Sequence, residues 1–197
     1  MAKFTTSLFL LLSLLALTST AYSTVAKGSV PSNFVKSSCG VTRYPDLCIQ
    51  SLAMYSSLIQ TSSKQMAQTA LSVSLVKARS AKAYVINMSK AKGLKRREYQ
   101  VVKDCVDNIG DSVDRLSKSI TELGRMSQGK EESFMWHMSN VQTWVSAALT
   151  DENTCVDGFA GRGMNGKVKS TIIAKITNVA QCTSNALALI NRFADKH

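Results

Sequence analysis

The chain of 197 residues carries 24 lysines and arginines against 13 aspartates and glutamates, which gives a formal net charge of +11 at pH 7. A protein this basic is drawn to polyanions, of which acidic polysaccharide, nucleic acid and lipid headgroups are the candidates. Nothing in the sequence resembles a nucleic-acid-binding module, so we expect no nucleic-acid partner, and the length suits one domain with a single core.

The first element in chain order is a short apolar run from Leu8 to Leu17. Such a run is too short to span a bilayer, and the small residues Ser19 and Ala21 follow it, which is typical of a secretory signal peptide. We therefore expect residues 1–21 to be a signal peptide, with cleavage after Ala26 as the alternative. No later segment approaches twenty apolar residues, which predicts a secreted protein without a membrane anchor.

Residues 29–60 are predicted to form a helical hairpin. Pro31 and Pro45 both suit the first turn of a helix, the second within the start signal TRYPD. This predicts two short helices that are joined through CGVTRYP and linked by the nearby Cys39 and Cys48. A hairpin this small needs a cross-link or packing against a larger body to be stable.

Residues 62–193 are predicted to form the larger body. Apolar residues recur every three or four positions in four segments, 67–88, 102–123, 134–148 and 172–193, and no proline occurs after Lys64. Short connections that contain glycine, written GLKRR, GRMSQG and GFAGRGMNG, separate these segments. The pattern predicts an all-α protein, an antiparallel up-down-up-down four-helix bundle preceded by the disulfide-stapled hairpin.

Residues 161–166, with the sequence GRGMNG, match the G-x-G-x-x-G pattern of dinucleotide-binding turns. That turn requires a β-strand before it, but the preceding segment TWVSAALTDENTCVDGFA has helical periodicity. An acidic residue about twenty positions further on is also missing. We interpret these residues as the connection between the third and fourth bundle helices, and we expect no cofactor.

Catalytic patterns are also missing from the sequence. There is no G-x-S-x-G motif, and His137 is the one internal histidine after the signal peptide. Its large apolar neighbours Phe134 and Met138 place it at a core edge rather than in the role of a general base. We therefore expect that the chain is not an enzyme.

Five cysteines follow the signal peptide: Cys39, Cys48, Cys105, Cys155 and Cys182. In an oxidising compartment an odd number implies either two disulfides and one free thiol or an intermolecular bond. Spacing alone does not decide the pairing, although the first two cysteines are the easiest to join. Because the chain has no C-x-x-C pair and only two histidines, we expect no metal site.

Three surface features bear on partners. Asp104, Asp107, Asp111 and Asp114 recur at spacings of three and four on the second bundle helix, which predicts one acidic stripe. This stripe is either a solvated face neutralised by pairs such as Lys103–Asp107 and Asp114–Lys118 or a contact surface for a basic partner. Five of the eight residues at 90–97 are basic, which indicates either a solvated turn or a docking patch for an anionic matrix. Asn87, followed by Met and Ser, forms an N-glycosylation sequon.

Four quoted segments resemble a known family: TRYPDLC, VKDCVDNIGDSVDRL, WVSAALTDENTC and AQCTSNALALI. Together they make the chain similar to the plant invertase/pectin methylesterase inhibitor domain over residues 29–193. The resemblance implies a four-helix bundle with an N-terminal helical hairpin. It also implies the disulfides Cys39–Cys48 and Cys105–Cys155, with Cys182 as a free thiol.

The resemblance further implies a function without catalysis. Members of the family cover the active-site cleft of a pectin methylesterase or an acid invertase in a non-covalent 1:1 complex. Invertase inhibitors typically carry Pro-Lys-Phe near the start of the third bundle helix, whereas this chain has GKEESF at residues 129–134, which favours the esterase.

Residue by residue, the resemblance implies a contact surface for the esterase. Related inhibitors hold acids that match Asp107, Asp111 and Asp114, and they use the position of Thr154 at the same interface. The expected function is therefore a secreted apoplastic inhibitor of pectin methylesterase that modulates the methyl-esterification of wall pectin. The alternatives are an inhibitor of cell-wall or vacuolar acid invertase and a non-inhibitory basic wall protein that binds anionic pectin electrostatically.

Overall fold

The structure is a computed structural model that describes residues 30–126, 131–160 and 166–196, with the side chains of residues 131 and 132 left out. The predicted signal peptide at residues 1–21 lies outside this part of the chain, as do residues 161–165 of GRGMNG. The described residues are almost entirely helical and include no β-strand. None of their helices is long and apolar enough to cross a membrane.

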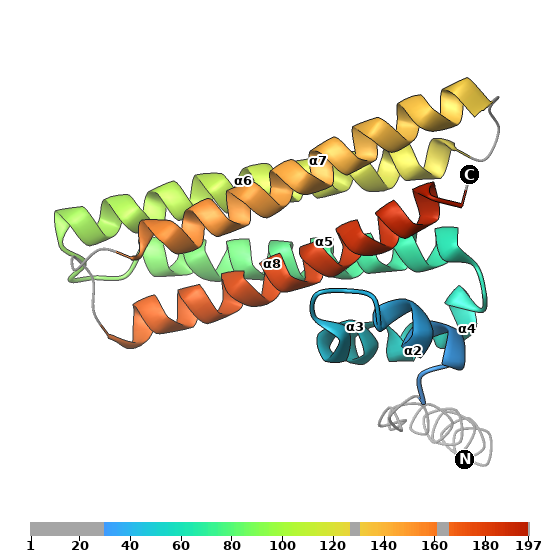
Figure 1. Cartoon of the computed structure of the whole chain (residues 1–197). Helices are drawn as coiled ribbons and strands as arrows, with labels where there is room; N and C mark the ends of the chain where they lie inside the picture. The colour runs from blue at the N-terminus through green and yellow to red at the C-terminus, as the bar shows by residue number, and fades with distance from the viewer. Residues whose placement is uncertain (1–29, 127–130, 161–165, 197) are drawn as a thin grey trace, which may run out of the picture.

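Four long helices form the body of the molecule: α5 (Ser63–Ser89), α6 (Arg96–Arg125), α7 (Glu131–Gly158) and α8 (Lys167–Ala194). Helix α5 packs against α6 and α8, and α7 packs against the same two helices, so the four close into a bundle. Figure 1 shows that consecutive helices run in opposite directions. The all-α fold class is therefore confirmed.

The core follows the predicted period. All seven core positions expected on the last helix, spaced by three or four from Ile172 to Phe193, are buried. On α5 the corresponding positions are mostly alanine and serine, including Ala67, Ser74 and Ala78, and all three are fully buried. Small side chains let neighbouring helices approach closely, while each fully buried leucine or isoleucine contributes roughly 1.5–3 kcal/mol of hydrophobic stabilisation.

The helix starts and ends are set by local chemistry, and several depart from the prediction. Gly124 and Arg125, predicted in the GRMSQG connection, lie in the last turn of α6, and Gly158, predicted in the GFAGRGMNG connection, is the last residue of α7. The Ser62 hydroxyl accepts a hydrogen bond from the Gln65 N–H at the start of α5. At the start of α6, the Lys95 N–H donates to the Glu98 carboxylate over 2.9 Å. Arg96 and Arg97, predicted to lie in the GLKRR connection, instead form the first two residues of α6. The connection is therefore residues 90–95, and Glu98 closes the first turn onto it.

The N-terminal segment contains more elements than predicted: α2 (Asn33–Cys39), α3 (Pro45–Leu52), the 3-10 turn η1 (Ala53–Tyr55) and α4 (Ser56–Ile59). Pro45 is the first residue of α3, as expected. Pro31 was wrongly placed in the first turn of a helix, because Ser32 caps α2 by accepting from the Val35 N–H. The proline therefore lies one residue before the cap.

The hairpin is fixed to the bundle by a two-point hydrogen bond. The Asn185 side chain of α8 accepts from the Tyr44 N–H over 3.0 Å and donates to the Tyr44 carbonyl over 2.8 Å. Asn185 is buried, so these bonds satisfy an amide that would otherwise destabilise the core. Val35, Leu52 and Ile59 are buried alongside, and Figure 1 shows the hairpin beside the α5 and α8 side of the bundle.

Two disulfides lie in the described part of the chain. Cys39 is bonded to Cys48 across the hairpin, and Cys105 of α6 is bonded to Cys155 of α7. Cys182 is free and buried, and burial raises the pKa of its thiol. An unreactive thiol follows, because the thiolate is the nucleophilic form.

The one described residue of GRGMNG is Gly166, which directly precedes α8. Its φ of +106° is a conformation that side chains other than glycine rarely adopt. Gly166 therefore allows the backbone conformation that precedes the first residue of α8.

Candidate functional site

The acidic stripe of α6 lies on the solvent side of the bundle. Asp107, Asp111 and Asp114 are all exposed, and none of them makes an ion pair within the described residues. The pairs Lys103–Asp107 and Asp114–Lys118 are therefore not formed. The fourth member, Asp104, accepts a hydrogen bond from the Gln100 amide over 2.7 Å. Three carboxylates thus remain available to a partner.

A second helix continues this surface. Asp151 of α7 forms a salt bridge of 2.7 Å with Arg115 of α6. Burial raises the pKa of Asp151, the Arg115 guanidinium opposes this rise, and the negative charge of Asp111 adds a smaller contribution to it. Thr154 is exposed three residues beyond Asp151 and so lies on the same side of α7.

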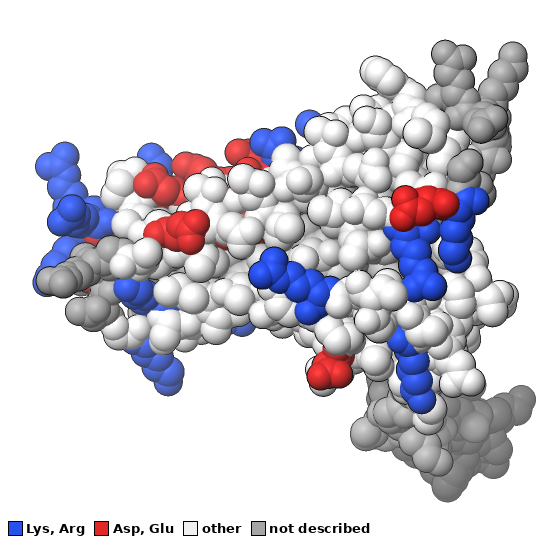
Figure 2. Space-filling model, viewed as in Figure 1, with Lys and Arg blue, Asp and Glu red and all other residues white. Residues whose placement is uncertain are grey.

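We refer to five residues as the acidic face: Asp107, Asp111, Asp114, Asp151 and Thr154. Figure 2 shows acidic side chains over the α6 and α7 part of the molecule, while basic side chains gather at the end where α5 meets α6 and α8 begins. The Thr154 hydroxyl donates to the Thr150 carbonyl over 2.8 Å, which leaves its oxygen lone pairs free to accept.

The disulfide holds the acidic face rigid. Cys155 directly follows Thr154, and its bond to Cys105 brings the two Cα atoms to 4.5 Å from each other. This bond joins α6 and α7 within one turn of Asp107, so the two halves of the face cannot slide relative to each other. A rigid surface loses little conformational entropy when a partner binds.

Below the acidic face lies a buried acid, Glu152, that was not predicted as a site residue. Glu152 is completely buried, and one of its oxygens accepts from Ser112 over 2.6 Å and from Thr183 over 3.0 Å. Its other oxygen has no hydrogen-bond partner among the residues that the structure describes. Burial raises the pKa of Glu152 to about 7; the two hydroxyl groups oppose this rise, and the negative charge of Asp151 adds to it.

A sequence signal for Glu152 did exist. The core positions Val141, Val145 and Ala148 of α7 continue at spacings of four and three to Glu152 and then to Cys155. An acid at such a position is predicted to point into the core. The partners Ser112 and Thr183 lie on other helices, so only the packing of α6, α7 and α8 identifies them.

At the opposite end of the same helix pair, His137 takes a structural role. Its Nδ1 lies 2.8 Å from the carboxylate of Glu122, and the Asn140 amide donates to the same oxygen over 3.0 Å. These hydrogen bonds, with the positive charges of His137 and Arg125, lower the pKa of Glu122 against the opposing effect of burial. His137 is half-buried at the core edge, as expected.

The remaining predicted site residues lie apart from the acidic face. Asn87 is exposed in the last turn of α5, so a glycan there would not disturb the core. Cys182 is buried in α8 with its sulfur 3.9 Å from the Ser51 hydroxyl. No group of three His, Cys, Asp or Glu side chains within the described ranges is arranged to hold a metal ion.

Comparison with known proteins identifies the family. A family model described as plant invertase/pectin methylesterase inhibitor matches residues 33–189. The chain belongs to this family. Pectinesterase inhibitor 9 of Arabidopsis thaliana is 50% identical over 197 residues, which cover 98% of this chain and 96% of that protein.

Two further comparisons show a second similar sequence and a solved structure with a similar fold. The 21 kDa protein of Daucus carota is 49% identical over 173 residues, which cover 87% of this chain and 90% of that protein. The crystal structure of a mutant form of a pectin methylesterase inhibitor from Arabidopsis matches the fold with a TM-score of 0.64. That match covers 81% of this chain and 97% of the other at 19% identity. The chain thus belongs to a family of enzyme inhibitors rather than to a family of enzymes.

Proposed function

We propose that this inhibitor-family member is a secreted inhibitor of pectin methylesterase that acts in the apoplast. It would form a non-covalent 1:1 complex, cover the active-site cleft of the esterase and so modulate the methyl-esterification of cell-wall pectin. The relatives named as pectinesterase inhibitors support this choice of target. The observation that carries the proposal is the set of three exposed, unpaired carboxylates Asp107, Asp111 and Asp114 on a helix pair that a disulfide holds rigid.

The acidic face supplies what recognition of a basic surface requires. Its unpaired carboxylates can accept charge-assisted hydrogen bonds from lysine or arginine, which are roughly twice as strong as neutral hydrogen bonds. Thr154 adds an exposed hydroxyl oxygen beside them. An acidic surface on an otherwise basic inhibitor also orients the approach, so complementary charges raise the association rate more than the final affinity.

The family name covers a second target, the acid invertases. The absence of proline in GKEESF at residues 129–134 supports the esterase, because the resemblance associates Pro-Lys-Phe at that position with invertase inhibition. Acid invertase therefore stands as the alternative target.

A paired assay with one preparation of the oxidised protein tests the proposal. Increasing amounts of the inhibitor are added to a pectin methylesterase and, separately, to an acid invertase at mildly acidic pH. We expect saturable inhibition of the esterase near one-to-one stoichiometry and no effect on the invertase. Inhibition of the invertase alone would transfer the assignment to the alternative target.

A further inference from the structure

The acidic residues of the bundle are concentrated in one of its two layers, where a layer means one pair of packed helices. Helices α6 and α7 carry all but two of the chain's 13 acids, and the two exceptions are Asp46 and Asp195. Helices α5 and α8 carry no acid at all. Their basic residues are Lys64, Lys77, Arg79 and Lys82 on α5 and Lys167, Lys169, Lys175 and Arg192 on α8.

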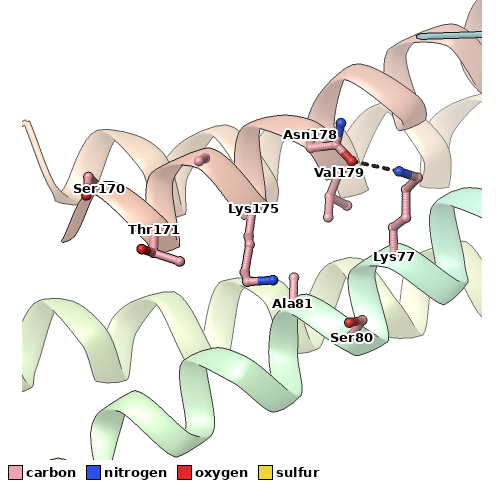
Figure 3. A pocket seen from close by; sticks show the side chains of 9 residues that line it. Lys77, Ser80, Ala81, Ser170, Thr171, Lys175, Asn178 and Val179 are labelled. Atoms are coloured by element: carbon pink, nitrogen blue, oxygen red, sulfur yellow. Dashed lines mark hydrogen bonds between the residues drawn. The ribbon is translucent and has the colours of Figure 1, made fainter. Parts of the chain in front are cut away.

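An open groove of about 700 Å³ lies between these two acid-free helices. Its floor is formed by small and apolar side chains such as Ala81 and Ala174. Its polar lining consists of Lys77, Ser80, Ser170, Thr171, Lys175 and Asn178. Figure 3 shows Lys77 and Lys175 reaching toward the groove from opposite sides, one from each helix.

Neither groove lysine is neutralised by an acid in the described part of the chain. The Lys77 ammonium donates to the Asn178 side-chain oxygen over 2.7 Å, and Lys175 lies over the Tyr84 ring at 5.0 Å from its centroid. An ammonium group has three N–H donors, so Lys77 keeps two and Lys175 keeps all three for a ligand. The two neutral partners hold the charges in place without cancelling them.

The hydroxyl groups at one end of the groove complement the lysines. Ser170 and Thr171 both donate to the Lys167 carbonyl, over 3.0 and 2.8 Å. Their hydrogens are therefore occupied, while their oxygens can still accept from a ligand hydroxyl. The groove thus offers cationic donors for carboxylates and neutral acceptors for hydroxyl groups.

The shape of the groove selects an elongated ligand. Its lining on α8 runs from Ser170 to Val179, which is about 14 Å along a helix at 1.5 Å per residue. The Ser170 end of the groove lies at the end of the bundle where α5 ends and α8 begins. The positive charge is extended there by five exposed residues: Lys90, Lys92, Lys95, Arg96 and Arg97. Among the described residues the groove is lined by lysine and not by arginine, whose planar fork suits phosphate.

We propose that the groove between α5 and α8 binds a chain of uronic acid residues, the de-esterified form of an acidic wall polysaccharide. Its carboxylates would bind Lys77 and Lys175, and its hydroxyl groups would donate to Ser170 and Thr171. This site lies on the layer away from the acidic face and does not rest on the proposed esterase inhibition. The inhibitor can then be held on a polyanion by one layer while the other stays free for a basic partner.

Calorimetric titration with a de-esterified oligogalacturonate, and with the same oligomer fully methyl-esterified, tests the site at fixed ionic strength. We expect the de-esterified oligomer to bind and the methyl ester to bind weakly or not at all. The double variant K77Q/K175Q should weaken binding about tenfold, since it removes two hydrogen bonds from charged groups. The variant K77R/K175R, which keeps both charges, should restore binding.

A matched control separates a site from diffuse attraction. The variant K64Q/R79Q removes the same charge from α5 outside the groove lining, from the partly exposed Lys64 and the exposed Arg79. Charges near the surface are worth little, so we expect less than about threefold weakening. Equal losses in the two double variants would overturn the proposal. The proposal would also be overturned if the methyl ester bound as tightly as the de-esterified oligomer. The same holds if a sulfated polysaccharide bound as tightly and depended equally on Lys77 and Lys175.

Two measurements keep the proposal testable if a variant fails to fold. In the unsubstituted protein, amide NMR signals of the groove residues, Ser170 and Thr171 among them, should shift on addition of the oligomer. Shifts confined to residues 90–97 would place the ligand on the connection and overturn the groove. Inhibition of the esterase by K77Q/K175Q should be unchanged; a parallel loss of inhibition would contradict two separate sites.

Discussion

The two layers of the bundle share their helical geometry but differ in what joins their helices. In the α6 and α7 layer, a disulfide, the salt bridge Arg115–Asp151 and the Glu122–His137 pair connect the helices directly. In the described part of the α5 and α8 layer, the hydrogen bond from Lys77 to Asn178 and the contact of Lys175 with the Tyr84 ring join the helices beside the groove. The α6 and α7 layer is therefore a cross-linked surface, whereas the α5 and α8 layer holds an open, positively charged groove.

This difference shows how one small bundle can offer two surfaces of opposite charge. The acidic residues lie on helices that are cross-linked to each other, so their exposed carboxylates keep a defined arrangement. The basic residues of α5 and α8, by contrast, lie on helices that carry no acid of their own. Since exposed charges are screened beyond about 8 Å at physiological ionic strength, the two surfaces can act on different partners.

The largest effect is expected from opening the disulfide between α6 and α7. The variant C105S/C155S releases a cross-link between residues 50 apart, which should lower the free energy of unfolding by about 4 kcal/mol. Thermal and urea unfolding measure this loss. The variant C39S/C48S, which opens a separation of 9 residues, should lose less, about 3 kcal/mol. The reverse order would show that the α6 and α7 layer does not depend on its cross-link.

The next effect concerns the buried acid of the same layer. Because burial raises the pKa of Glu152 from 4.5 to about 7, the folded protein binds more protons than the unfolded chain between these values. The stability that the protonated carboxyl confers is therefore complete below pH 4.5 and is lost as the pH rises to about 7. The total loss should be of the order of 3 kcal/mol.

Urea unfolding at several pH values measures this dependence. The variant E152Q carries no titrating group at this position, so its free energy of unfolding should fall less between pH 4.5 and 7 than that of the unsubstituted protein. The Ser112 hydroxyl favours the ionised form of Glu152, so S112A should raise the pKa of Glu152 further. The decline in the free energy of unfolding should then extend to higher pH. Identical pH profiles for E152Q and the unsubstituted protein would show that Glu152 does not titrate in this range.

A smaller effect is expected from neutralising the acidic face. The variant D107N/D111N/D114N should slow association with pectin methylesterase about tenfold at low salt, since charge steering acts mainly on the association rate. Stopped-flow or surface plasmon resonance at several salt concentrations measures the rate. For a matched comparison, D111N/D114N is set against D46N/D195N, which removes two exposed acids from other surfaces. Equal association rates in the two double variants would show that the acidic stripe is a solvated face and not a contact surface for the esterase.

The smallest effect is expected at the Glu122–His137 pair. The variant H137A removes a hydrogen bond to a carboxylate whose pKa is lowered, which should cost about 1 kcal/mol because Asn140 still donates to the same oxygen. Because the pKa of Glu122 is lowered in the folded protein, the ionised carboxylate stabilises the fold above pH 4.5, and this stability is lost as the pH falls through the pKa of folded Glu122. Without His137 less of this stability exists, so H137A should unfold at a higher pH than the unsubstituted protein when acid is added. An unchanged acid midpoint would contradict the pairing.

Much of the fold could be predicted, because helical periodicity is a local property. The spacing of apolar residues identified all four long helices, and Pro45 marked the start of α3. The start of α6 was placed too late because both Arg96 and Arg97 look like loop residues. Only the hydrogen bond between Glu98 and the Lys95 N–H shows where the first turn begins. A cap depends on backbone geometry that composition does not reveal.

The candidate site was predicted only in part. Periodicity placed Asp107, Asp111 and Asp114 on one side of a helix. It could not show that their intrahelical lysine partners stay apart, because long exposed side chains choose among many rotamers. Glu152 was missed because an acid is expected at the surface, and its partners Ser112 and Thr183 come from two other helices.

By itself, the sequence determined the elements of this protein: four amphipathic helices, a proline-started hairpin, an acidic helix and two helices without any acid. These are properties of neighbouring residues, which spacing and composition record. Tertiary structure decided that a groove lies between the two acid-free helices, that Asn185 holds the hairpin at Tyr44 and that one oxygen of Glu152 has no hydrogen-bond partner among the described residues. The physical reason is that burial and pairing depend on which side chains of distant segments share a volume from which water is excluded.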